Sequence, residues 1–174
     1  MQIPGIILLI SLPLGITACS GDEISTVDSW STSAQSSDVE IREIAQIDEI
    51  RSAAHEAYDR LVIVFSNNQL PRYDIRFIEE APKACGSGHV VDIAAPEVLE
   101  IRLEPSRAHN DAGVSTLEQR ERDLPHPILK EYVVTCDFEA VFAIVAGIDG
   151  ARPFRVSEMH DPARIVIDVR HEMP

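Results

Sequence analysis

Short segments that alternate between apolar and polar side chains are the feature that most constrains how this chain folds. Residues 72–77 and 99–103 alternate strictly, and residues 164–169 do so more loosely. Alternation with a period of two, rich in β-branched residues, is typical of strands with one buried face. Residues 61–65 and 141–146 are apolar at both parities, which predicts central strands.

Turn signals separate these segments. They are Asn67-Asn68, Gly86-Ser87-Gly88, Asp149-Gly150 and Asp161-Pro162. Several short strands divided in this way predict an all-β fold, either a sandwich or a barrel.

Two segments fit this pattern less well. Isoleucines at 41, 44, 47 and 50 are spaced by three, which matches neither a strand nor a helix closely, and we interpret them as a helix over 39–46 followed by a strand over 47–53. Residues 104–127 are polar and contain three prolines, which predicts a long loop. Loops of that length in a small domain are often functional or mobile.

The first 18 residues carry no charged side chain and are mostly apolar between positions 6 and 16. This run is shorter than the roughly 20 residues of a spanning helix, and Pro13 and Gly15 interrupt it, so it is typical of an export signal. Export signals usually open with Lys or Arg, which this one lacks.

The end of this signal, Ile16-Thr17-Ala18-Cys19, resembles the lipobox of bacterial lipoproteins. A narrow peptidase pocket admits only small side chains before the cut, and the following thiol receives a diacylglycerol. The resemblance implies that residues 1–18 are removed and that Cys19 is the lipid-anchored first residue, on the extracytoplasmic side of the cell membrane. The alternative is a plain secretory signal with an incidental cysteine.

Residues 20–37 contain seven serines and few apolar side chains. They bury too little apolar surface to offset the entropy of ordering, so we expect residues 19–37 to form a flexible tether and residues 38–174 to form the folded domain. Trp30 lies within this tether and either reaches the membrane interface or is incidental.

The charge balance excludes one large class of function. The chain has 29 acidic and 15 basic residues, a net charge of −14. Such a chain repels phosphate backbones, so we expect no nucleic-acid partner. Aromatic residues make up only 5%, which argues against a platform of stacked rings.

Two cysteines, Cys85 and Cys136, remain after Cys19. An even number in an exported protein favours a disulfide between them. A catalytic Cys136 would need a neighbouring base to lower its thiolate pKa, and no sequence feature supplies one.

Motifs of catalysis and of metal or cofactor binding are missing from the sequence. It has no nucleophile elbow, phosphate loop, HExxH motif or paired CxxC. His109 and Asp111 could share a cation but more simply belong to a solvated loop, and Gly86–His89 is either an anion-binding nest or a plain turn. We therefore expect a non-enzyme without cofactor or metal.

Arginine dominates the basic residues, because only Lys83 and Lys130 are lysines. Guanidinium groups bind carboxylates through two parallel hydrogen bonds, so a local cluster could hold a carboxylate-bearing wall polymer. The alternative is that each arginine pairs with a surface acid. The candidate binding residues on or beside predicted strands are Arg60, Arg72, Arg76, Arg152, Arg155 and Arg164.

Four blocks in order resemble the AMIN-like domain of actinobacterial envelope proteins. The blocks are His55–Val62; Gly86-Ser87-Gly88 with Leu99–Leu103 and Ala108-His109; Asp137–Val141 with Gly147–Gly150 and Arg152–Val156; and Asp161–Val169. The resemblance covers residues 47–170. It departs at Ala57, where the family usually has glycine, which leaves a tight turn there in question.

The resemblance implies a β-sandwich of short antiparallel strands at the cell envelope. AMIN domains in the broader sense are associated with peptidoglycan binding and with placing envelope machinery. The leading hypothesis is therefore a lipid-anchored, non-catalytic module that binds peptidoglycan or another envelope component, and the alternative is a scaffold or regulatory partner of a wall enzyme. Asp59, Arg60, Arg164 and Asp168 in the matching blocks are either ligand contacts or structural ion pairs.

Overall fold

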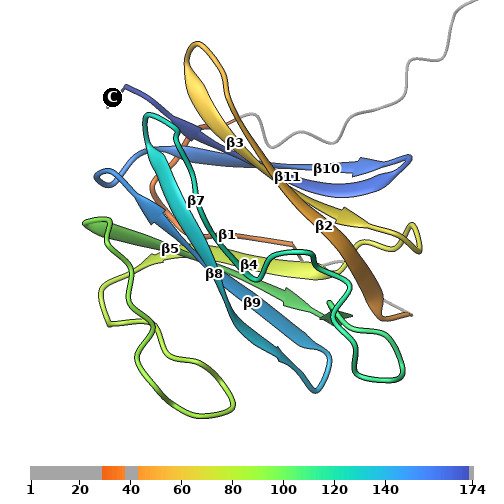
Figure 1. Cartoon of the computed structure of the whole chain (residues 1–174). Coiled ribbons are helices and arrows are strands. Elements are labelled where there is room, and N and C mark those ends of the chain that lie inside the picture. The colour runs from red at the N-terminus through yellow and green to blue at the C-terminus, as the bar shows by residue number, and fades with distance from the viewer. Residues whose placement is uncertain (1–28, 38–42, 173–174) are drawn as a thin grey trace, which may run out of the picture.

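Two β-sheets lie face to face in the computed structural model, which describes residues 29–37 and 43–172 (Figure 1). The proposed signal peptide and Cys19 lie outside the described residues. The strands are β1 (Gln35–Ser36), β2 (Ala45–Ala54), β3 (Tyr58–Phe65), β4 (Arg72–Ile78), β5 (Glu97–Glu104), β6 (Ser106–Arg107), β7 (Glu121–Asp123), β8 (Leu129–Phe138), β9 (Val141–Ile148), β10 (Phe154–His160) and β11 (Ala163–Arg170).

The strand order confirms the predicted all-β fold and identifies it as a β-sandwich. One sheet has six strands in the order β1-β4-β5-β9-β8-β7, and the other has five in the order β10-β11-β3-β2-β6. Among the described strands, only the short β2–β6 pairing is parallel. The fully apolar segments predicted as central strands fall in β3 and β9, which have a neighbour on each side.

Side chains of alternate residues from both sheets form the core. Removing one such Leu, Ile or Phe side chain from water contributes about 1.5–3 kcal/mol. The largest fully buried side chains are Phe65, Phe142, Phe154, Ile47, Leu61, Ile63, Ile75, Leu99, Ile101, Leu103, Leu129 and Ile144.

The predicted helix over residues 39–46 is wrong where it can be compared, because Ala45 and Gln46 belong to strand β2. The pairing of β2 with β3 shifts between Ile47 and Glu49, which marks a β-bulge at Asp48. The extra residue lets both Ile47 and Ile50 face the core, where they are 0% and 7% exposed. The spacing of three between Ile47 and Ile50 therefore reflects the bulge, whereas Ile44 is 43% exposed and takes no part in the core.

Residues 29–37 form a strap across one open side of the sandwich. Ser31 bridges to Phe154 of β10, while Gln35 and Ser36 pair with Ile75 and Asp74 of β4 in the other sheet. The Gln35 side chain donates a hydrogen bond to the Phe154 carbonyl (2.8 Å) and accepts one from the Val156 N–H (3.2 Å). The sequence predicted a flexible tether as far as Ser37, and for residues 29–37 this prediction is wrong. The edges of both sheets supply hydrogen-bond partners for this segment, which its composition does not reveal.

The disulfide predicted between Cys85 and Cys136 is present, with a Cα–Cα distance of 5.2 Å. It joins the loop between β4 and β5 to strand β8. The Cys85 N–H also donates to the Thr135 carbonyl (2.9 Å). Within residues 29–37 and 43–172, the structure has no helix that could cross a membrane.

Asp137 anchors the long polar segment between β5 and β8, which is irregular apart from β6 and β7. Its carboxylate accepts hydrogen bonds from the Ala108 N–H (2.9 Å) and Arg120 (3.0 Å) and lies 2.9 Å from His109 Nδ1. Burial alone would raise the pKa of Asp137, but these three contacts outweigh it and hold the pKa below its ordinary value of 3.8.

This lowered pKa makes the stability conferred by Asp137 depend on pH. A carboxyl group whose pKa is lower in the folded state stabilises the protein above its unfolded pKa and loses that effect as pH falls through the folded value. We expect Asp137→Asn to be less stable than the native chain at about pH 6, and the difference to shrink below about pH 3.8. Urea unfolding of both proteins across that range is the measurement, and a difference that stays constant would contradict the assignment.

Candidate functional site

Six residues gather on the outer surface of the five-stranded sheet, and we call this group the arginine–aromatic face. Its members are Trp30, Tyr58, Arg60, Arg155, Asp168 and Arg170. Strand register brings the central three together, because Arg155 of β10 pairs with Asp168 of β11, which pairs with Arg60 of β3. The same register pairs Arg170 with Tyr58 in the next row.

Asp168 lies at the centre of this face and is only 1% exposed although it points away from the core. Arg60 binds it through both branches of its guanidinium, at 2.6 Å to Oδ1 and 2.9 Å to Oδ2. Arg155 contacts Oδ2 from the other side, at 3.0 and 2.9 Å. The hydrogen bonds to Asp168 raise the pKa of Arg60, because they favour its charged form.

Two aromatic rings cover the guanidinium groups. Arg155 lies 4.6 Å from the ring centre of Trp30 and 5.5 Å from that of Tyr58. Arg60 lies 5.2 Å from the Tyr58 ring. Such cation–π contacts contribute about 0.5–2 kcal/mol each, so they hold both the arginines and Trp30 of the strap in place.

Arg170 completes the face at the end of β11. Its guanidinium lies 5.5 Å from the ring centre of Trp30. Within residues 29–37 and 43–172, no carboxylate forms an ion pair with it. The face thus combines three guanidinium groups, one buried carboxylate and two rings, which suits an anionic group attached to an apolar surface.

The six arginines predicted as binding residues do not form one cluster. Arg60 and Arg155 belong to the arginine–aromatic face. Arg72 and Arg76 lie on β4 of the other sheet, where Arg76 pairs with Glu100 at 3.1 Å. Arg152 binds the Asp149 and His171 carbonyls, and Arg164 binds the Pro162 carbonyl. These three hydrogen bonds fix the two guanidinium groups beside their own loops, away from Asp168.

Sequence reasoning missed Trp30, Tyr58 and Arg170. Arg170 lies two residues after Asp168 on one strand, and residues two apart share a face of a sheet, so extending the alternation by one step would have found it. Trp30 had no such signal, since its place depends on the strap.

The other polar candidates are separate from this face. His109 contacts Asp137, while Asp111 pairs with Arg107 at 2.8 Å, so the two do not share a cation. No group of residues able to hold a metal ion occurs in the described part of the chain. At Gly86–His89 the backbone forms a turn, in which the Gly88 N–H donates to the Ala84 carbonyl (2.8 Å).

The family model that matches this chain is that of the AMIN-like domain, over residues 45–171. The chain belongs to the AMIN-like domain family. The match covers β2 to β11 and therefore both sheets of the sandwich. Ala57, where the family usually has glycine, does not have a positive φ. The turn still closes, through a hydrogen bond from the His55 N–H to the Tyr58 carbonyl (2.9 Å).

Membership of the AMIN-like family indicates an extracytoplasmic, cell-wall-related binding module. Neither the curated proteins nor the solved structures contain a match to this chain.

Proposed function

We propose that this AMIN-like protein is a lipid-anchored, non-catalytic module that binds a carboxylate-bearing wall polymer, peptidoglycan above all, through its arginine–aromatic face. The observation that carries the proposal is the convergence of Arg60, Arg155 and Arg170 beside two rings. A guanidinium group holds a carboxylate through paired hydrogen bonds. The rings of Trp30 and Tyr58 offer apolar surface for the sugar carbons next to it.

The charge of the remaining chain supports a local binding site rather than a diffuse one. At a net charge of −14, the average surface repels an anionic polymer. Adhesion therefore requires a place where cations outnumber anions, and among the described residues the arginine–aromatic face has three guanidinium groups to one carboxylate.

The lipobox resemblance supports anchoring through Cys19. Only 11 residue steps separate Cys19 from Trp30 (30 − 19), and at about 3.5 Å per step a fully extended chain spans at most about 40 Å. The arginine–aromatic face would consequently work close to the membrane surface.

Retention of the full chain on purified insoluble peptidoglycan tests this function. We expect the native chain in detergent to be retained, and Arg170→Gln to lower its affinity about tenfold, which corresponds to the loss of one charge-assisted contact. Arg170 is chosen because its removal leaves the Asp168 ion pairs intact. The matched control is Arg102→Gln on β5 of the other sheet, whose neighbour is Glu104 at 3.3 Å.

Two results would contradict the proposal. One is equal retention of Arg170→Gln and Arg102→Gln, and the other is no retention of the native chain. Release of soluble wall fragments by the pure protein would contradict its non-catalytic character.

A further inference from the structure

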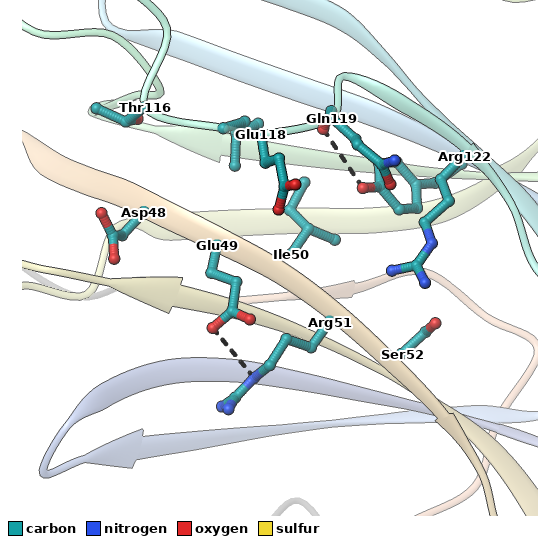
Figure 2. Close-up of a pocket in the computed structure, with 11 residues that line it drawn as sticks. Asp48, Glu49, Ile50, Arg51, Ser52, Thr116, Glu118, Gln119 and Arg122 are labelled. Carbon is teal, nitrogen blue, oxygen red and sulfur yellow. Dashed lines mark hydrogen bonds and ion pairs between the residues drawn. The ribbon is translucent and has the colours of Figure 1, made fainter.

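Strand β2 has an unpaired outer edge that faces a groove. Strand β6 pairs only with Ala45 and Gln46 of β2, and β3 occupies the other edge, so no strand of the described part of the chain pairs with the outer side of residues 48–54. The groove beside this edge has a volume of about 450 Å³, which is within the range of ligand sites. Its opposite wall is the segment 116–122 (Figure 2).

Hydrogen bonds close the groove at both ends. Thr116 Oγ1 donates to the Ile47 carbonyl (2.5 Å) at one end, and His126 Nε2 lies 2.9 Å from Ser52 Oγ at the other. Four residues of strand, 48–51, lie between these contacts, and the five residue steps from Ile47 to Ser52 span about 16 Å. An internal segment of a folded partner would have to pass through the closed ends, whereas a peptide of three or four residues fits between them.

Opposite charges stand at the two ends of the groove. Asp48 lines the end near Thr116, Arg122 lines the end near Ser52, and the Glu118 side chain lies between them (Figure 2). The β-bulge places Asp48 there, because its extra residue turns the side chain out of the regular alternation. None of these three side chains forms an ion pair within the described residues.

We propose that this groove binds a short, extended peptide with a free end, its amino group at Asp48 and Glu118 and its terminal carboxylate at Arg122. The peptide backbone would add to the open edge of β2, as in other complexes in which a peptide extends a sheet. Ile50, Leu117 and Tyr132 line the groove between the charged ends and are at most 7% exposed, so they form a firm floor for small side chains.

This site is separate from the arginine–aromatic face and does not depend on the function proposed for it. The groove lies at the β2 edge, whereas the arginine–aromatic face lies on β3, β10 and β11. Loss of polymer retention with intact peptide binding would therefore overturn only the former proposal, and the converse result only this one.

Titration of the full chain with the tetrapeptide Lys-Ala-Val-Ala, followed by backbone amide chemical shifts, is the test. We expect saturable shifts at residues 48–52 and 116–122. Arg122→Gln should weaken binding about tenfold, the loss expected for one charge-assisted contact, and so should amidation of the peptide carboxylate. The two changes should not add, because each removes the same contact.

Glu118→Gln provides the second variant, on the acidic side of the groove. It should weaken Lys-Ala-Val-Ala more than the same peptide with an acetylated terminal amino group, while the β5 controls Arg102→Gln and Glu104→Gln bind as the native chain does. The proposal is overturned if millimolar peptide causes no saturable shift at the groove. It is equally overturned if Arg122→Gln binds as tightly as Arg102→Gln.

Discussion

Replacing Asp59 with alanine is expected to lower the free energy of unfolding by about 3–5 kcal/mol. Asp59 is 0% exposed, and its Oδ2 accepts hydrogen bonds from the backbone N–H groups of Ile128 (2.7 Å) and Leu129 (2.9 Å). Its Oδ1 lies 2.9 Å from His171 Nε2, which must donate because a carboxylate only accepts. Alanine would leave two buried N–H groups without partners and remove the carboxylate partner of His171 Nε2.

Chemical denaturation with Asp59→Ala, Asp59→Asn and Asp149→Ala measures this effect. Asparagine keeps one acceptor oxygen, so Asp59→Asn should lose less unfolding free energy than Asp59→Ala. If the alanine variant does not fold, the stability of the asparagine variant can still be measured. The Asp149 side chain is 56% exposed and lies 3.9 Å from Lys130 Nζ, and its replacement should change stability by no more than about 0.5 kcal/mol because the backbone hydrogen bonds of Asp149 remain. An Asp59→Ala protein as stable as the Asp149→Ala control would show that the buried contacts of Asp59 do not stabilise the fold.

Removing the disulfide is the other change of large expected effect. Cys85 and Cys136 are 51 residues apart in sequence, and closing a loop of that size stabilises a fold by about 4 kcal/mol through the entropy of the unfolded chain. The double variant Cys85→Ser/Cys136→Ser should lose about that amount. Its loop would still be held by Glu131, whose Oε1 accepts from the N–H groups of Ala94 (2.8 Å) and Ala95 (3.2 Å).

Guanidinium unfolding with and without reductant checks this result. Reductant should bring the native chain to the stability of the double variant and leave the double variant unchanged. Cys19→Ser should unfold as the native chain does in both conditions. If the unfolding midpoint of the native chain is the same with and without reductant, the disulfide does not stabilise the fold.

The strands could be predicted from sequence because the core of a sandwich imposes a period of two on each of them. Residues 72–77 and 99–103 alternate since one face of β4 and β5 is buried, and β9 is apolar throughout since it is central. The prediction failed at the start of β2, where a single bulge at Asp48 places two buried isoleucines, Ile47 and Ile50, three residues apart. It also failed at the strap, whose order comes from the edges of β10 and β4 rather than from its own composition.

The candidate site was only partly predictable. Arginines could be recognised as candidates, but the strand register that brings Arg60 and Arg155 to the same carboxylate is a property of three strands far apart in sequence. Charge pairing likewise depends on that register, which is why Asp168 became the centre of a cluster and Arg76 became a partner of Glu100. Trp30 joined the site through backbone contacts of the strap.

Trp30 fluorescence tests binding at the arginine–aromatic face most directly. It is measured while the protein is titrated with soluble peptidoglycan fragments that retain their carboxylates. Trp30 is the chain's only tryptophan, and its ring lies against Arg155 and Arg170, so its emission reports on this face alone. A ligand held there should change the emission saturably in the native chain and in Arg102→Gln, at concentrations about tenfold lower than in Arg170→Gln. Fragments that bind the protein while Trp30 emission stays constant would contradict the assignment of the site.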